Sequence, residues 1–225
     1  VNSVHEVRYI DCVENIVSAI KTISTAPVII GGSGFSVMPI QVLNKGGADY
    51  GVVGEGEELM CSFVAAFEKG KLPDGPIIKT PFQMKGISIP SAFYSLELME
   101  FYQNKGQIIS VQTKRGCNKK CIYCSYPVLE GTTLRSRAPE AVVDDIEFLI
   151  QERSAKYIFF VDSVFNDSEG LYRHVIKEMY NRKITINWTA FFTPIRELDD
   201  EIVALMKVTG LHTAEIGLEL MLHRI

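Results

Sequence analysis

The most informative stretch of the sequence is residues 113–124, which read TKRGCNKKCIYC. It directly follows residues 108–112, a short apolar run with the length and composition of a buried strand. Three cysteines stand in it at C-x3-C-x2-C spacing: Cys117, Cys121 and Cys124. Three thiolates on one short loop can hold one face of a metal ion or cluster. We therefore expect this loop to carry the chemistry of the protein.

The number of cysteines favours an iron–sulfur cluster over zinc. A [4Fe–4S] cluster takes four ligands, so three cysteines leave one iron open to a substrate or cofactor. A structural zinc site normally has four protein ligands, and the fourth would have to be Cys12, Cys61 or His174, none at zinc-ribbon spacing. Cations around the loop would lower thiol pKa values and offset the charge of a thiolate-bound cluster. These cations are Lys114, Arg115, Lys119, Lys120, Arg135 and Arg137.

The composition is that of a globular protein. Of the 225 residues, 47% are hydrophobic and 22% are charged, which excludes a disordered or low-complexity chain. The net charge of −4 is too mild to predict a nucleic-acid-binding surface or an acidic tail. No apolar run approaches the roughly 20 residues of a membrane-spanning helix. Five cysteines, three of them in one loop, indicate a reducing compartment, so we expect a cytoplasmic location.

Outward from the loop, strands and helices alternate toward the C-terminus. The predicted strands are 108–112, 157–161, 184–189 and 213–217, and the predicted helices are 140–153, 168–181 and 199–208. Such alternation predicts right-handed crossovers, the unit from which an α/β barrel is built. Four strands cannot close an eight-stranded barrel. Residues 107–225 are therefore expected to form a partial (β/α) TIM-type barrel.

Two further βα units precede the loop. The apolar strands 28–30 and 50–53 are each followed by a glycine-containing turn. The residues of these turns are Gly31, Gly32, Gly54, Glu55 and Gly56. Glycines at both strand ends predict a parallel sheet with a ligand at its carboxyl edge.

The sequence divides into three parts by composition. We expect an α/β domain at 1–75, a linker rich in proline and glycine at 76–106, and the partial barrel at 107–225. The chain opens with Val1 and stops just after a predicted strand, so we expect it to be a piece of a longer protein.

The cysteine loop resembles that of the radical S-adenosylmethionine (SAM) superfamily. The resemblance lies in the cysteine spacing, the aromatic Tyr123 before the third cysteine and the strand before the loop. It implies that Cys117, Cys121 and Cys124 ligate a [4Fe–4S] cluster and that SAM chelates the fourth iron. Reductive cleavage of SAM would then give a 5′-deoxyadenosyl radical, with the electron supplied by a donor such as flavodoxin or ferredoxin. Tyr123 would pack near the SAM adenine.

The resemblance also implies SAM contacts at the ends of later strands. Asp162 stands where the family usually has a Gly-Gly-Glu-like stretch that holds the SAM amino group. The sequence departs from that stretch, but its Asp-x-x-Phe resembles the cobalamin-associated branch. Glu219 lies in a Gly-x-Glu and could accept hydrogen bonds from the ribose hydroxyls, and Arg137 could pair with the methionine carboxylate. The alternatives are a capping or surface aspartate, a solvated glutamate and a surface arginine.

The first domain resembles the C-terminal part of a cobalamin-binding, Rossmann-like (flavodoxin-like) domain. The resemblance implies that Gly31, Gly32 and the turn at 54–56 approach the cobalamin. An Asp-x-His-x-x-Gly motif, which supplies a cobalt ligand in many cobalamin proteins, does not occur in the sequence. An alternative is that this half-domain is a scaffold that binds no ligand.

Taken together, the chain resembles a cobalamin-dependent radical SAM enzyme that transfers a methyl or alkyl group to an unactivated carbon of a small-molecule or natural-product-type substrate. A tRNA-modifying radical SAM methylthiotransferase is one alternative, but that family carries three further cysteines upstream. Cys12 and Cys61 cannot supply them, and we expect both to be buried core thiols. A zinc-stabilised nucleic-acid-binding module is the other alternative, and the net negative charge argues against it.

Overall fold

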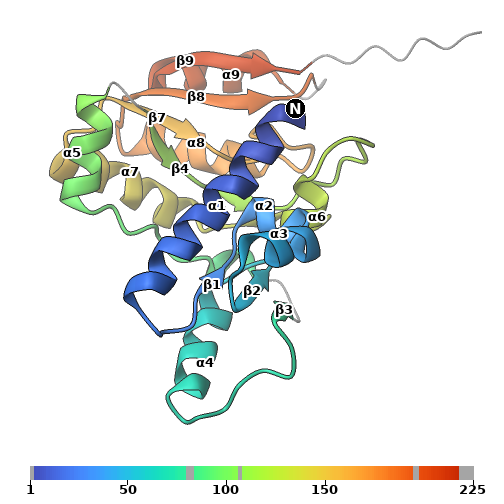
Figure 1. Cartoon of the computed structure of the whole chain (residues 1–225). Helices are drawn as coiled ribbons and strands as arrows, with labels where there is room; N and C mark the ends of the chain where they lie inside the picture. Colours follow the sequence, from blue (N-terminus) through green and yellow to red (C-terminus); the bar gives the residue numbers. More distant parts are fainter. Residues whose placement is uncertain (1–2, 80–83, 106–107, 195–197, 218–225) are drawn as a thin grey trace, which may run out of the picture. The chain divides into compact units, whose positions relative to one another are not determined.

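The protein is described from a computed structural model covering residues 3–79, 84–105, 108–194 and 198–217 (Figure 1). Its contacts divide the chain into two compact units. Unit 1 is Val1–Met84 together with Lys119–Thr132, and unit 2 is Lys85–Asn118 together with Thr133–Ile225. The division therefore runs through the cysteine loop, which the composition of the sequence did not indicate.

Unit 1 is built on a three-stranded parallel sheet in the order β1-β2-β3. Its strands are β1 (Ile29–Ile30), β2 (Tyr50–Val53) and β3 (Ile77–Lys79). Its helices are α1 (Ser3–Ile23), α2 (Ser33–Val37), α3 (Pro39–Gly46), α4 (Glu57–Phe67) and α6 (Tyr126–Glu130). Because the strands are parallel, the turns after β1 and β2 lie at the same edge of the sheet, as predicted.

A buried aromatic ring holds β2 against α2. Phe35 of α2 is 2% exposed and packs in the core of unit 1 with Val42 and Leu43. A Cβ atom added at Gly51 would lie 1.9 Å from Cζ of Phe35. Gly51 therefore provides the space that this ring fills.

We predict that Gly51→Ala destabilises unit 1 by about 1–3 kcal/mol, the usual cost of overpacking a well-filled core. Chemical denaturation followed by circular dichroism measures the change. Gly34→Ala is the matched control, because a Cβ at Gly34 meets no atom within 4 Å. Equal stability of the two variants would contradict the prediction.

Unit 2 contains a four-stranded parallel sheet in the order β4-β7-β8-β9. Its strands are β4 (Ile109–Val111), β7 (Tyr157–Phe160), β8 (Asn187–Phe192) and β9 (Leu211–Ile216). The helices that connect them are α7 (Pro139–Arg153), α8 (Leu171–Asn181) and α9 (Asp200–Thr209), as Figure 1 shows. The predicted alternation of strands and helices is confirmed. Strand β8 begins at Asn187, whereas the predicted strand begins at residue 184.

Shorter elements complete unit 2. They are the 3-10 turn η1 (Gly86–Ser88), helix α5 (Leu96–Asn104) and the antiparallel pair β5 (Lys114–Arg115) and β6 (Arg135–Ser136). Residues 76–106, predicted to be a linker, thus contain β3, η1 and α5.

The core of unit 2 lies between the sheet and its helices. Alternate side chains of the strands face this core, and Ile158, Phe160, Trp188 and Ala190 are fully buried there. Since successive side chains of a strand point to opposite faces, their neighbours face away from the helices. The rigid sheet fixes the carboxyl ends of β4 and β7, from which the cysteine loop and the loop that follows β7 emerge.

Candidate functional site

The three cysteines of the loop differ in exposure. Cys117 is buried, Cys124 is half-buried and Cys121 is exposed, and all three thiols are free. The backbone N–H of Cys124 donates to the carbonyl of Cys121 at 3.2 Å, which closes a turn between them. Cys117 belongs to unit 2, whereas Cys121 and Cys124 belong to unit 1.

The thiols are not gathered into a finished metal site. Within the residues that the structure describes, no three His, Cys, Asp or Glu side chains are grouped so that they could hold a metal ion. The donor set still suits a cluster, because three free thiols within eight residues supply three of the four iron ligands.

The aromatic residue of the loop lies at the surface. Tyr123 is 67% exposed and the neighbouring Ile122 is 96% exposed. Two large apolar side chains on one loop leave apolar surface that a bound ring could cover. The predicted packing of Tyr123 near the SAM adenine stays a prediction.

Asp162 is fully buried at the end of β7, so it is not the surface residue of the alternative interpretation. Its Oδ1 accepts hydrogen bonds from the backbone N–H groups of Thr113 at 2.8 Å and Lys114 at 3.2 Å. Its Oδ2 accepts from the hydroxyl of Thr113 and from Nζ of Lys114. Both carboxylate oxygens are thus bonded to the residues that lead into the cysteine loop.

Lys114 is one of the six cations expected around the loop, and its burial is not indicated by the sequence. Its side chain is only 1% exposed. Its ammonium group lies 3.3 Å from carboxylate oxygens of both Asp162 and Asp167, and it donates to the carbonyl of Phe165 at 2.7 Å. The only sequence signal for this pairing is that two aspartates follow one strand end.

Arg137 is also buried, and its guanidinium group is committed to other partners in unit 2. Nη2 lies 2.8 Å from Asp145 and donates to the hydroxyl of Ser91, and Nη1 donates to the carbonyl of Gln112 at 3.0 Å. Arg137 is therefore not a surface arginine. Its Nε has no hydrogen-bond partner among the described residues, and the predicted contact with a SAM carboxylate stays a prediction.

The environment of Asp145 also affects a tyrosine. Tyr94 donates from its hydroxyl to the carbonyl of Ser110 at 3.0 Å. Burial raises the pKa of Tyr94 to about 12, and the nearby charge of Asp145 adds to the shift. Tyr94 is therefore a neutral hydrogen-bond donor at physiological pH.

In unit 1 the predicted cofactor-binding turns lie at the carboxyl ends of β1 and β2. Gly32 has φ +89° and Gly54 has φ +91°, conformations that favour glycine. The N–H of Gly54 donates to Oγ of Ser36 at 3.1 Å, and the Glu55 carboxylate accepts from the N–H of Met84 at 2.8 Å. The turns are therefore well defined, while ligand contacts by Gly31, Gly32, Gly54, Glu55 and Gly56 stay a prediction.

The remaining expectations concern Glu219 and the two cysteines outside the loop. Glu219 lies outside the described residues, so its predicted role stays a prediction. The prediction that Cys12 and Cys61 are buried was wrong, because both are exposed. Among the residues whose exposure is described, α4 has no buried residue and α1 has only Val17, so apolar neighbours in the sequence do not guarantee burial.

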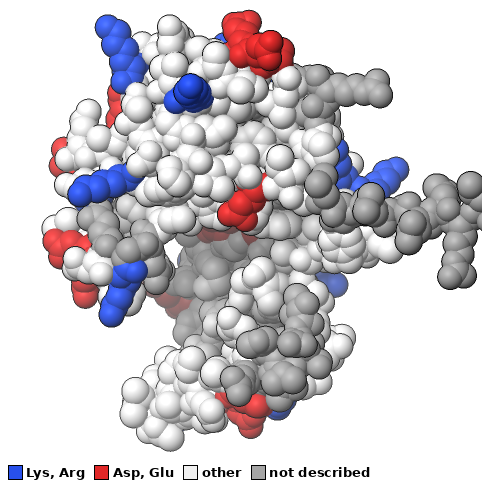
Figure 2. Space-filling view, turned by 90° about the horizontal axis from the view of Figure 1, so that it is seen from above, with Lys and Arg blue, Asp and Glu red and all other residues white. Residues whose placement is uncertain are grey.

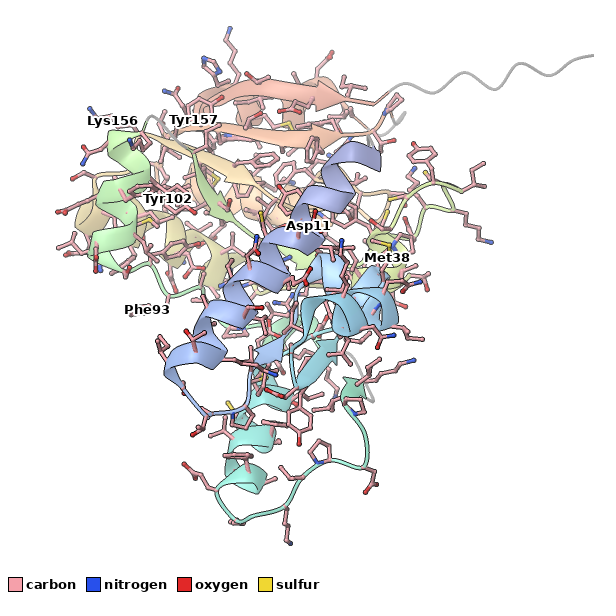
Figure 3. The ribbon with its side chains drawn as sticks, in the orientation of Figure 1. Asp11, Met38, Phe93, Tyr102, Lys156 and Tyr157 are labelled. Atoms are coloured by element: carbon pink, nitrogen blue, oxygen red, sulfur yellow. The ribbon has the colours of Figure 1, made fainter. Side chains whose placement is uncertain are left out.

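A second polar group lies at the opposite end of the unit 2 sheet. The hydroxyl of Tyr157, at the start of β7, lies 2.9 Å from Nδ1 of His212 on β9. Figure 3 shows Lys156 and Tyr157 at this amino end of the strands. In barrel enzymes the amino ends serve stability and the carboxyl ends carry the chemistry, so the cysteine loop is the better candidate.

In the part of the chain that the structure describes, the face shown in Figure 2 presents no cluster of basic side chains. On the face shown in Figure 2, lysine and arginine side chains stand singly among uncharged atoms and acidic groups. No helix among the described residues is long and apolar enough to cross a membrane.

Comparison with known proteins identifies the family. Residues 111–222 match the Radical SAM superfamily. The chain is 22% identical to tryptophan 2-C-methyltransferase of Streptomyces laurentii, over 93% of the chain and 46% of that protein. The solved structures that it resembles include TsrM of Kitasatospora setae, a radical SAM methyltransferase with bound cobalamin and [4Fe–4S] cluster, at TM-score 0.79 and 24% identity. That alignment covers 93% of the chain and 46% of TsrM.

A second solved structure also resembles the chain in fold. OxsB, a cobalamin-dependent SAM radical enzyme with aqua-cobalamin and SAM bound, superposes at TM-score 0.69 and 16% identity, over 93% of the chain and 33% of OxsB. The chain thus spans less than half the length of each of these proteins. Both likenesses cover nearly the whole chain, which confirms the predicted α/β fold with a Rossmann-like part before a partial barrel. The part of the chain at residues 111–222, which contains the three cysteines, belongs to the Radical SAM superfamily.

Proposed function

We propose that the chain is the cofactor-binding part of a cobalamin-dependent radical SAM methyltransferase that methylates an unactivated carbon of a small molecule. One observation carries the proposal: a C-x3-C-x2-C loop directly follows the first strand of a parallel β/α sheet, inside the residues that match the superfamily. The likeness of unit 1 and unit 2 together to TsrM supports the cobalamin part.

In this proposal Cys117, Cys121 and Cys124 hold the cluster and leave one iron coordination site for SAM. A bound [4Fe–4S] cluster supplies the electron for reductive cleavage of SAM, and bound cobalamin carries the methyl group. The exposure of the cysteine side chains differs along the loop. Cys117 is buried in unit 2, so we expect the loop to be fixed at this cysteine. Cys121 is exposed, so we expect its side chain to adjust its position when a cluster binds.

Other described residues would bind SAM and cobalamin in this proposal. Tyr123 offers an exposed ring beside Cys124 for the adenine of SAM. The glycine turns after β1 and β2 allow a large flat ligand to approach the backbone at the carboxyl edge of the unit 1 sheet. Asp162 and Arg137 do not enter this proposal as SAM ligands, because other residues of unit 2 already bond to both carboxylate oxygens of Asp162 and to both Nη atoms of Arg137.

A small-molecule substrate is proposed on the basis of the relatives. TsrM has been solved with its tryptophan substrate, and it covers the same two units. An electron donor of the flavodoxin or ferredoxin type would serve the cluster. The net charge of −4 gives the chain little electrostatic attraction for a nucleic acid, which favours a small substrate.

The proposal is tested by loading the purified chain with iron and sulfide under anaerobic conditions. We expect about four irons and four sulfides per chain. The electron paramagnetic resonance (EPR) spectrum of the reduced cluster should change on addition of SAM, since SAM fills the open iron site. Cobalamin should co-elute with the chain in gel filtration.

Each readout has an outcome that rejects one part of the proposal. Stoichiometric zinc with no iron would reject the cluster and favour the zinc module. A cluster whose EPR spectrum does not change on addition of SAM would reject the radical SAM assignment. A cluster-loaded chain that does not retain cobalamin would reject the role proposed for the turns of unit 1.

A further inference from the structure

We propose that Lys114 is a positioning residue that fixes the stem of the cysteine loop, so that Cys117 is in place before a cluster binds. The inference rests on the proposed cluster-binding function. It concerns a residue that has no part in ligating the cluster. The loop stem is defined here as residues 113–118, all of which lie in unit 2.

The ammonium group of Lys114 is buried inside unit 2. It lies 3.3 Å from Asp162 and 3.3 Å from Asp167, donates to the carbonyl of Phe165 at 2.7 Å and lies 5.4 Å from the centre of the Phe165 ring. Burying a charge is costly unless it is paired and hydrogen-bonded. The position of Lys114 is therefore set by these partners, which all belong to the segment that follows β7.

Each of the two aspartates is anchored by a second set of bonds. Asp162 accepts from the backbone of Thr113 and Lys114, at the end of β4. Asp167 accepts from the N–H groups of Glu169 at 3.0 Å and Leu171 at 3.2 Å, and so caps the start of α8. Lys114 thus joins the loop stem to β7 and to α8 at one buried point.

Two more bonds extend this attachment to Cys117. The hydroxyl of Ser163 donates to the carbonyl of Gly116 at 3.0 Å, and the amide of Asn118 donates to the hydroxyl of Ser168 at 3.3 Å. These bonds fall on the residues directly before and after Cys117, which is 6% exposed. The next cysteine, Cys121, is exposed.

Removing the ammonium group should therefore release the stem. In Lys114→Met the carboxylates of Asp162 and Asp167 would face each other in a buried site without a cation between them, and their repulsion would push the stem away from α8. A double variant, Lys114→Met with Asp167→Asn, removes one of the two charges. Its amide oxygen can still cap α8, so the double variant keeps the inference testable if the single variant does not fold.

The experiment measures how fast each thiol of the chain reacts with N-ethylmaleimide before any cluster is added, by mass spectrometry of peptides. In the wild type we expect Cys117 to react at least about tenfold more slowly than Cys121, because it has to be released by local opening. In both Lys114 variants the ratio of the two rates should approach one. Arg182→Met is the matched control, since Arg182 also pairs with three carboxylates, those of Asp144, Glu147 and Glu178, but at the far end of α8.

A second readout follows cluster loading. At limiting iron, the Lys114 variants should take up several-fold less iron than Arg182→Met, with a broadened EPR signal, since one ligand is no longer held in place. Protection of Cys117 that persists in a folded Lys114 variant would overturn the inference. A wild-type chain that forms no cluster would instead overturn the proposed function, and the alkylation ratios would still decide the role of Lys114.

Discussion

Replacement of Cys117 by alanine is expected to remove the iron–sulfur cluster. Two remaining thiolates leave two irons of a cubane without protein ligands, so we expect less than about a tenth of the wild-type iron and sulfide after anaerobic loading. The broad visible absorption of the cluster should fall in proportion. Colorimetric iron and sulfide assays and visible spectroscopy measure the effect.

We expect Cys117→Ala to keep its fold, so that loss of the cluster reports on the missing ligand and not on unfolding. Buried cysteine behaves as a small apolar side chain, and alanine differs from it mainly by one sulfur atom. Cys12→Ala is the matched control, because Cys12 is a free, exposed thiol of α1 outside the loop. A Cys117→Ala chain that keeps a full cluster would show that Cys117 is not a ligand, and the proposed function would then fail.

Asp162→Ala is expected to lower the free energy of unfolding of the chain, measured without any ligand, more than a substitution of a surface aspartate does. The substitution leaves the N–H and hydroxyl of Thr113 and the N–H of Lys114 buried without their acceptor, and it breaks one buried ion pair. Loss of such a group costs about 3–5 kcal/mol of unfolding free energy. Urea denaturation of wild type and variant measures the difference.

Asp199→Ala provides the comparison for this result. Asp199 caps α9 by accepting from the N–H of Ile202 at 2.9 Å, and its side chain is 53% exposed. Loss of a helix cap at the surface costs only about 0.5–2 kcal/mol. If Asp162→Ala instead left the stability unchanged and weakened SAM binding alone, the SAM contact implied by the resemblance would be correct and the structural role would be wrong.

The sequence predicted those features that depend on local pattern. The alternation of apolar runs with amphipathic segments predicted β7, β8, β9 and the helices between them, because hydrophobic periodicity directly reflects which face is buried. The start of β8 was misplaced because Ile184 and Ile186 are buried before the strand begins. Burial alone does not identify the residues that pair in a sheet.

The roles of individual charged residues could not be predicted in the same way. The sequence predicts Lys114 and Arg137 as cations around the cysteine loop, but it does not indicate that both are buried in ion pairs. A buried charge is stable only beside its partner, and the partner of Lys114 stands 48 residues away in the chain. Exposure of Cys12 and Cys61 was missed for a related reason, since the face of a helix that meets the core is set by its packing.

By itself the sequence determined the number and spacing of the thiols, and with them the kind of metal group that the loop suits, because a ligand count does not depend on the fold. It also determined the order of strands and helices, through the periodicity of apolar residues. Only the tertiary structure decided that Cys117 is buried and Cys121 is exposed, and that Asp162 accepts hydrogen bonds from the loop stem. These properties depend on distances between segments that approach one another only when the parallel sheet brings the ends of β4 and β7 together.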